Sequence, residues 1–368
     1  MIEAAAARSR AYAAAATFAA VALGPTGAAR AGRHDLALLK LCSREPSAAM
    51  AVAAECSWVK RDAASGVIVS PVRVDPAAET RFRSLMSELG AVMAPRLQTP
   101  ADTLGFSGFQ VTAEIGATQI HNQAPYWDGV EGVSSAVPGA PAGRPDAWLT
   151  TVGGFVRKGI WLPLPAFEIG AGAVNLVGSR MIAAQGYAKL ALHEGFHDWV
   201  LPSLAVRGGV SRVTGANDVQ LTIGSFDISV SKAFGVGGTA RLEPFGGVSF
   251  LFIDARSEVI DATPSCDAYA AAQGSTAGRG GLCADAQTGR GFNDLNANFV
   301  FPDQDVITRT RLFAGFKLKV AVAALVAEYQ LTRAGESRDG ARRSGAPTGA
   351  KDESGGQHGV SLSAGLDF

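Results

Sequence analysis

The sequence of 368 residues balances 33 basic against 33 acidic side chains, so its formal net charge is zero. This balance gives no reason to expect a nucleic acid or a strongly acidic partner. Only 18% of the residues are charged, and 44 residues are glycine. Beyond the N-terminal region, no apolar run reaches the roughly 18 residues of a membrane-spanning helix, so the sequence predicts none.

The first 31 residues have the three parts of an export leader. Arg8 and Arg10 form a basic start, Ala11–Gly24 is an apolar stretch, and the small-residue sequence A-R-A at 29–31 is a cleavage site. The apolar stretch is too short for a membrane anchor. We therefore expect residues 1–31 to be a signal peptide that is removed during export.

Four cysteines fall into two local pairs in this exported chain. Cys42 and Cys56 lie near the mature N-terminus, and Cys266 and Cys283 flank a stretch rich in glycine and alanine. Because exported proteins commonly form disulfides, we predict Cys42–Cys56 and Cys266–Cys283 bonds. Neither pair has the C-x-x-C spacing of zinc ribbons or thioredoxin-like sites.

Residues 32–104 have helical rather than strand character. In Glu79–Met93, apolar side chains recur at three-to-four spacing, which predicts an amphipathic helix. Its apolar positions are Phe82, Leu85, Met86, Leu89 and Met93. The region is either a small periplasmic segment or a plug inside a barrel, and both placements stay open. Within it, Gly66–Val74 is a candidate for an additional strand.

From about residue 105 onward, apolar residues recur at every second position, which is the period of a β-strand. For example, Leu312 and Phe316 share one face of a segment whose other face carries Arg309 and Arg311. The segments are about twice the usual length of five or six residues, which suits tilted strands that cross a bilayer. About ten strands are expected, or twelve with additional segments: 105–119, 148–160, 165–175, 181–192, 203–213, 218–233, 240–254, 305–318, 320–333 and 357–368.

One segment, Asn217–Lys232, loses the strict alternation. Its apolar positions fall in two phases: Val219, Leu221 and Ile223, then Phe226, Ile228 and Val230. The phase changes at Gly224-Ser225. A glycine-containing β-bulge at that point would absorb the extra residue.

The connections between the predicted strands differ in length from one side to the other. If the last strand runs inward, the long polar connections 120–147, 255–304 and 334–356 all fall on the opposite side. The short ones fall together on the inner side: 161–164, 195–202, 234–239 and about 318–320. Long outer loops and short periplasmic turns are typical of outer-membrane barrels.

In hydrocarbon, every backbone N–H and C=O needs a partner, which only a helix or a closed sheet supplies. The chain resembles the bacterial outer-membrane β-barrel proteins in its leader, its alternating segments and its terminal strand His358–Phe368. The resemblance implies an all-β antiparallel barrel over 105–368, located in the outer membrane and surrounded by its lipid. It also implies that Phe368, a terminal aromatic residue, is the signal for the barrel-insertion machinery.

If the apolar faces meet lipid, the polar faces line the lumen. Eleven charged side chains are then predicted to point inward: Glu114, Glu168, Lys189, Arg207, Asp227, Arg241, Glu243, Arg309, Arg311, Lys317 and Glu328. Such a set either sorts ions and small solutes in an open pore or pairs into a structural network that fills the interior. Ten strands are close to the size at which side chains fill the barrel.

The segment Ala191–Pro202 contains His193-Glu194-Gly195-Phe196-His197, a literal match to the zinc-peptidase pattern H-E-x-x-H. That pattern works only on a helix, where both histidines reach one metal. Here the preceding segment alternates as a strand, glycines interrupt the motif, and no third ligand stands at the expected spacing. We interpret His193 and His197 as belonging to a periplasmic turn, with no metal and no cofactor.

Three functions are compatible with these patterns. The first is passive transport of a small or hydrophobic solute across the outer membrane. The second is a structural or adhesive barrel that acts through its extracellular loops. The third is a hydrolase, either at the H-E-x-x-H motif or at a loop edge, where His121 lies near Asp128 and Glu131. No G-x-S-x-G nucleophile motif accompanies His121, so we do not expect an enzyme.

Overall fold

The computed structural model describes residues 32–41, 60–61, 68–69, 76–96, 99–133, 143–161, 166–194, 201–258, 260–261, 298–336 and 350–368. The predicted leader and all four cysteines lie outside these ranges. The leader cleavage and the two disulfide bonds therefore stay predictions.

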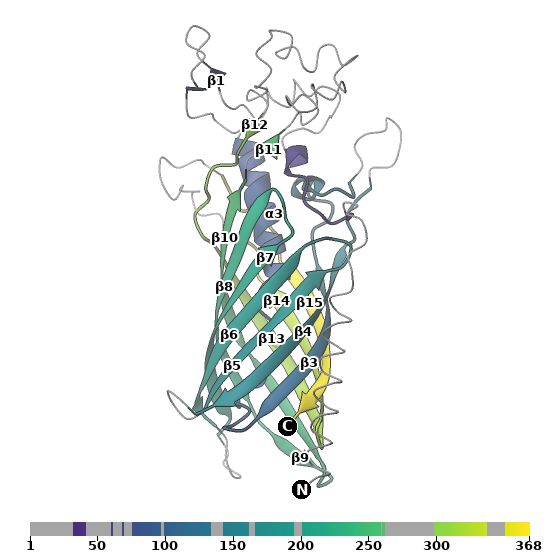
Figure 1. Ribbon diagram of the computed structural model, residues 1–368, viewed down its shortest axis with the longest axis vertical. Helices are drawn as coiled ribbons and strands as arrows, with labels where there is room; N and C mark the ends of the chain where they lie inside the picture. Colours follow the sequence, from purple (N-terminus) through teal and green to yellow (C-terminus); the bar gives the residue numbers. More distant parts are fainter. Residues whose placement is uncertain are drawn as a thin grey trace, which may run out of the picture.

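Ten antiparallel strands form one closed barrel, as predicted (Figure 1). Pairing of the last strand with the first, and of Ala240–Ser257 with Ile307–Val320, closes the sheet. The short strand β9 (Phe234–Val236) adds to the edge of one of them. The barrel strands are β3 (Phe109–Gln119), β4 (Trp148–Ile160), β5 (Phe167–Leu176), β6 (Ile182–His193), β7 (Ser203–Thr214), β8 (Val219–Ser231), β10 (Ala240–Ser257), β13 (Ile307–Val320), β14 (Ala323–Thr332) and β15 (Gln357–Asp367).

The possible extension to twelve barrel strands is wrong. In the candidate segment Gly66–Val74, the structure has only β2 (Ile68–Val69), which pairs with β1 (Lys60–Arg61) outside the barrel. A second small sheet joins β11 (Ile260–Asp261) to β12 (Asn298–Phe299). Two-residue strands are too short to cross a bilayer, which takes about nine to eleven residues.

The outer wall of the barrel is apolar because side chains alternate across each strand. Ile115, Phe316 and Leu362 each expose between 45% and 51% of their surface, while Arg311 and Ser363 on the opposite face are buried. The barrel strands are 10 to 18 residues long, enough to cross a bilayer when tilted. This pattern fits a wall with lipid outside and polar groups inside.

The bulge predicted at Gly224-Ser225 is wrong. β8 pairs with β7 and β10 in continuous register, and its buried positions alternate from Val219 to Ser231 without interruption. Leu221 and Ile223 point inward and Phe226 points outward. The apolar residues change phase because the lumen wall itself is apolar at one end of the strand.

Besides two short turns at 177–181 and 215–218, one end of the barrel holds all of the long connections. Those between β3 and β4, β10 and β13, and β14 and β15 lie at one end, which we call the loop-rich end (upper end in Figure 1). The connections 161–166, 194–202, 232–239 and 321–322 lie at the other, which we call the turn end and which also holds Phe368. This confirms the predicted sorting of long and short connections.

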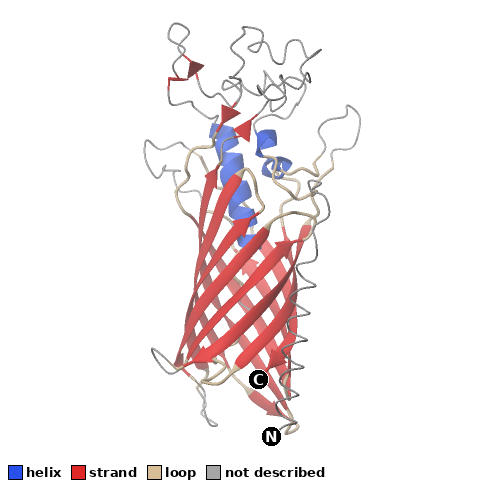
Figure 2. Cartoon of the chain, in the orientation of Figure 1, coloured by secondary structure: helices blue, strands red, loops and turns tan. Residues whose placement is uncertain are grey.

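The helices lie at the loop-rich end (Figure 2). They are the 3-10 helices η1 (Leu38–Leu41) and η2 (Pro125–Gly129) and the α-helix α3 (Pro76–Val92), which extends into the barrel against β8, β10 and β13. Proline at the first helical position and Glu79 in the first turn favour the start of α3, and Pro95 follows its end. Within the described residues, no helix has the length and apolar character needed to cross a bilayer.

Candidate functional site: the filled lumen and its cap

Residues 76–104 occupy the barrel lumen, and we call them the plug; positions 97 and 98 lie outside the described part. The plug begins with α3 at the loop-rich end, where Thr80 contacts Lys351. It ends at the turn end, where the Leu104 N–H donates to Glu168 Oε2 at 3.0 Å. The chain therefore passes through the barrel before it enters β3.

The serine face of α3 binds the segment that leads into β15. Glu353 N donates to Ser84 Oγ at 2.9 Å, and Ser87 Oγ donates to Asp352 Oδ2 at 2.8 Å. Arg309, one of the predicted lumen residues, donates to Ser87 Oγ at 2.9 Å. Small hydroxyl side chains let the helix approach this wall closely while every bond is satisfied.

The apolar face of α3 packs against the opposite side of the lumen. Phe82 stacks on Phe301 with ring centroids 4.6 Å apart. Gly90 lies so close to Ile253 that an added Cβ would be 2.7 Å from its Cδ1 atom. Phe82, Leu85, Met86, Leu89 and Met93, the positions predicted from spacing, are all buried in one apolar cluster.

Glu88 on α3 is a fully buried carboxylate that collects bonds from the loop-rich end. Tyr126 Oη and Trp127 Nε1 each donate to it at 2.7 Å, and His121 Nδ1 lies at 2.7 Å. The backbone N–H groups of His121 and Gly355 also donate to it, both at 3.1 Å. Burial, and the Glu88 carboxylate beside it, raise the pKa of Tyr126 above its usual range. Glu88 thus joins the plug to two loops.

The eleven predicted lumen residues divide by exposure. Ten of them are buried, whereas Arg241 exposes 50% of its side chain at the rim of the turn end. Six contact the plug: Glu114, Glu168, Lys189, Arg241, Arg309 and Arg311. Whether any of them sorts solutes stays a prediction.

Below α3 the plug is extended, and wall side chains bind its backbone. Gln185 accepts from Arg96 N at 3.0 Å and donates to the carbonyls of Met93 and Ala94. Arg311 Nη2 donates to the carbonyl of Pro95 at 3.0 Å. An extended chain leaves these groups without helical partners, so the wall must supply polar ones.

The plug also contributes a buried ion pair. Arg96 Nε lies 3.1 Å from Glu114 Oε1, and the two side chains are 4% and 2% exposed. Removing one partner of such a pair costs about 3–5 kcal/mol because the other charge stays buried alone. Arg96 also donates to Thr151 Oγ1 at 2.5 Å. These bonds hold the middle of the plug against β3 and β4.

At the turn end, charged groups hold the last residues of the plug. Lys189 Nζ donates to the carbonyls of Pro100 and Asp102, at 3.1 and 2.9 Å, and forms an ion pair with Glu168 at 3.2 Å. Arg241 Nη2 lies 2.7 Å from Asp102 Oδ2. Both charged wall groups therefore bind the plug.

The other predicted lumen residues bind one another or the wall. Arg207 pairs with Asp227 at 2.9 Å, and Lys317 pairs with Asp367 at 2.7 Å. Ser231 Oγ donates to Glu243, and Gln330 donates to Glu328. Opposite charges thus pair within the lumen.

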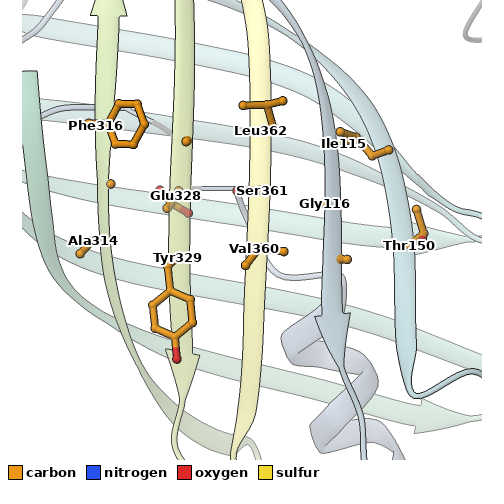
Figure 3. A pocket seen from close by; sticks show the side chains of 13 residues that line it. Ile115, Gly116, Thr150, Ala314, Phe316, Glu328, Tyr329, Val360, Ser361 and Leu362 are labelled. Atoms are coloured by element: carbon orange, nitrogen blue, oxygen red, sulfur yellow. The ribbon is translucent and has the colours of Figure 1, made fainter. Parts of the chain in front are cut away.

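One hollow among the described residues lies on the outer wall and not in the lumen. It is a groove of about 590 Å³ across β13, β14, β15, β3 and β4. Figure 3 shows Phe316, Leu362 and Ile115 around it, and the small residues Ala314 and Ala327 also line it. By contrast, a cavity of about 10 Å³ between Thr99, Lys189, Arg207, Asp227, Ser229 and Phe313 has room for about one water molecule.

The H-E-x-x-H motif begins at the turn end. β6 runs to His193, so the first histidine lies in a strand, and Gly195 to His197 are outside the described residues. Glu194 Oε1 accepts from Thr103 N and from Thr103 Oγ1, at 2.8 and 2.5 Å. The described residues contain no cluster of three metal-type ligands. In this structure Glu194 is a contact of the plug.

Two further predicted sites lie at opposite ends. Phe368 is 52% exposed at the turn end, and it exchanges backbone hydrogen bonds with Phe109 at 2.8 and 3.0 Å. Its role as an insertion signal stays a prediction. His121 binds Glu88 rather than its neighbours in sequence, Asp128 and Glu131.

Sequence analysis missed the plug residues that make most of these contacts. Glu88 and Arg96 were not singled out, and neither was Gln185 as their partner on the wall. One signal was present: beyond Arg83, the polar positions of the predicted helix are Ser84, Ser87 and Glu88, with no further lysine or arginine. A polar face of small residues is typical of close packing rather than of a solvated surface.

A closed antiparallel sheet with an apolar outer face and long connections at one end is the architecture of outer-membrane barrels. The protein is a closed ten-stranded β-barrel of this architecture. No protein-family model matches its sequence, and no curated protein matches it.

Solved structures with a similar fold are outer-membrane barrels of low sequence identity. Ail, the attachment invasion locus protein of Yersinia pestis, is 8% identical over 72% of this chain and 99% of its own, with a TM-score of 0.24. Neisserial surface protein A is 8% identical over 71% and 96%, with a TM-score of 0.24. The translocator domain of autotransporter NalP from Neisseria meningitidis is 12% identical over 72% and 89%, with a TM-score of 0.30. None is similar enough to carry a functional inference.

Proposed function

We propose that the protein is a plugged barrel that anchors a surface structure in the outer membrane and acts through the residues at its loop-rich end. One observation carries this proposal: the lumen is occupied by the plug, whose backbone and charges are bound by the wall. The plug lies across the route that a solute would take, from its contact with Lys351 at the loop-rich end to its contact with Glu168 at the turn end. The structural alternative is therefore favoured over passive transport.

The cap at the loop-rich end is the part that the proposal assigns to function. It is built from η1, from the segment 120–133 and from the turns beside them, and α3 supports it from below through Glu88. Because the barrel wall holds this assembly rigidly, it is suited to present a fixed surface. The partners expected are outer-membrane lipid around the wall and the insertion machinery at Phe368.

The proposal includes no catalysis. His193 and Glu194 lie at the turn end, where Glu194 accepts a hydrogen bond from Thr103 of the plug. Replacing His193 by alanine is expected to leave the metal content of the purified protein unchanged. Stoichiometric zinc in the wild type that the His193→Ala variant loses would instead support the peptidase alternative.

Conductance in planar bilayers tests the closed lumen. The wild-type protein is expected to be silent. Glu114→Ala, which leaves Arg96 without its partner, is expected to loosen the plug and to give transient openings. The matched control is Glu353→Ala, which removes a carboxylate from an exposed residue at the loop-rich end. Steady stepwise conductance of the wild type, altered by reversing the charge of Arg241, would support passive transport instead.

A further inference from the structure

The direction in which the plug passes through the barrel has a consequence for the N-terminus. We infer that residues 32–41 lie on the outer surface of the cell, and that the barrel carries its own N-terminal segment across the outer membrane. Three independent observations support this inference: the direction of the plug, the docking of residues 32–41, and the lengths of the connections.

The plug runs from the loop-rich end to the turn end. Thr80 and Ser84 at its start bind the segment 351–353, whereas Thr103 and Leu104 at its finish bind Glu194 and Glu168. The chain that precedes α3 therefore approaches the barrel from the loop-rich end. A periplasmic N-terminal segment would require the opposite direction.

Residues 32–41 are themselves bound at the loop-rich end. His34 N donates to the carbonyl of Gly178, and Arg180 Nε donates to Asp35 Oδ2 at 2.9 Å, which fixes this segment to the turn between β5 and β6. Asp35 also accepts from the backbone N–H of Arg180 at 2.7 Å. The Asp35 side chain is 3% exposed, so this contact is built into the cap.

A second set of contacts joins η1 to two other connections of the same end. Leu38 N lies 3.4 Å from Asp218 Oδ2, in the turn between β7 and β8. Lys40 Nζ donates to the carbonyls of Val130 and Val133 at 3.0 and 3.1 Å. Together with the turn at Gly178 and Arg180, these contacts reach three of the connections at the loop-rich end.

The loop-rich end is the outer one by the rule that extracellular loops are long and periplasmic turns are short. The three longest connections all lie there, and both ends of the barrel domain, Phe109 and Phe368, lie at the turn end. The sequence predicts that the leader directs the N-terminus into the periplasm. Residues 32–41 must then cross the outer membrane to reach the cap.

The barrel itself is the route that the geometry offers. The plug already occupies this route, and its packing leaves no room for a second passage of chain. The N-terminal segment therefore crosses before the lumen is packed. Predicted cleavage after residue 31 leaves the new amino group at Gly32, whose nitrogen lies 2.8 Å from Asp35 Oδ2.

Labelling of single introduced cysteines in intact cells with a membrane-impermeant maleimide tests this topology. Arg33→Cys reports on the N-terminal segment, because its side chain is 60% exposed. Lys351→Cys and Thr239→Cys are exposed controls at the loop-rich end and the turn end. The wild type gives the background of the native cysteines, and Lys40→Cys is a second reporter if Arg33→Cys fails to fold.

Arg33→Cys and Lys351→Cys are expected to label equally before and after permeabilisation, whereas Thr239→Cys labels only after it. Labelling of Arg33→Cys only after permeabilisation, with Lys351→Cys labelled in intact cells, would overturn the inference. Labelling of Thr239→Cys in intact cells would reverse the orientation and overturn it too. The conductance result is separate, because an N-terminus outside the cell is compatible with either a silent or a conducting barrel.

Discussion

The two halves of the lumen are both filled by the plug, but the wall that contacts the plug is apolar in one half and polar in the other. Near the loop-rich end, the plug is a helix and the facing wall is largely apolar, with Leu221, Ile223 and Ile253 fully buried. Near the turn end, the plug is an extended chain and the wall is polar and charged. The difference follows from the backbone of the plug.

A helix satisfies most of its own backbone groups, so the wall beside it contributes mainly packing, although Arg309 donates to Ser87 Oγ and Gln357 donates to the Glu88 carbonyl. An extended chain does not, and each unpaired buried N–H or C=O would cost about 1–3 kcal/mol. The carbonyls of Met93, Ala94, Pro95 and Pro100 accordingly each accept a bond from a wall side chain. Polar side chains of the lumen thus pair with backbone groups of the plug, and their presence alone does not indicate a water-filled pore.

Phe82→Ala should have the largest effect, because it removes the ring that stacks on Phe301 in the helical half. Truncation of a buried phenylalanine costs about 3–5 kcal/mol. We expect a lower urea midpoint in micelles and faster hydrogen exchange throughout α3. Phe234→Ala, at an exposed position of β9, is the matched control. Unchanged exchange in α3 would contradict the view that apolar packing holds this half.

Gln185→Leu tests the extended half, where the side chain bonds to three backbone groups of the plug. The expected loss is about 1–3 kcal/mol for each group left unpaired, even though leucine is more apolar than glutamine. Hydrogen exchange should rise in residues 93–96 and much less in α3. Gln220→Leu, on an exposed position of β8, serves as control. Equal stability of Gln185→Leu and the wild type would show that the wall and the extended chain are not coupled.

The barrel could be predicted from the sequence because strand alternation is a local property. The faces of Leu312 and Arg311 in β13 follow directly from the alternation, and the observed strand, Ile307–Val320, is shifted by two residues from the predicted 305–318. The sorting of long and short connections follows from the same strands. Both features need only the period of two and the closure rule for sheets in lipid.

The sequence left a plug and a periplasmic segment both open for residues 32–104, and the contacts of the plug could not be predicted because they join residues far apart in sequence. Glu88 bonds to Tyr126 and Gly355, and Arg96 bonds to Glu114 across the lumen. The phase change in β8 was a second local trace of the plug, besides the serines of the predicted helix. Leu221 and Ile223 face α3 in the lumen rather than lipid. The sequence analysis therefore interpreted an apolar stretch of the lumen wall as a bulge in the strand.

The smallest effect is expected at Asp218. This residue contacts η1 in the cap and lies in neither half of the lumen. Burial raises the pKa of Asp218, so the folded state holds its proton more tightly than the unfolded state does. The protonated Asp218 side chain therefore contributes most to the free energy of docking η1 below the ordinary aspartate pKa of about 3.9. This contribution is lost as pH rises through the raised pKa of Asp218. At neutral pH the charged carboxylate is a cost to docking.

Asp218→Asn removes that cost while its side-chain oxygen can still accept the bond from Leu38 N. We expect slower hydrogen exchange in residues 36–41 than in the wild type at pH 7, by less than about 1 kcal/mol because the carboxylate is partly solvated. The difference should shrink as both proteins are compared at lower pH, and Asp303→Asn should show none of it. Faster exchange in Asp218→Asn at pH 7 would mean that the Asp218 charge stabilises the cap. Electrostatic attraction would then hold η1, as it holds the turn-end half of the plug.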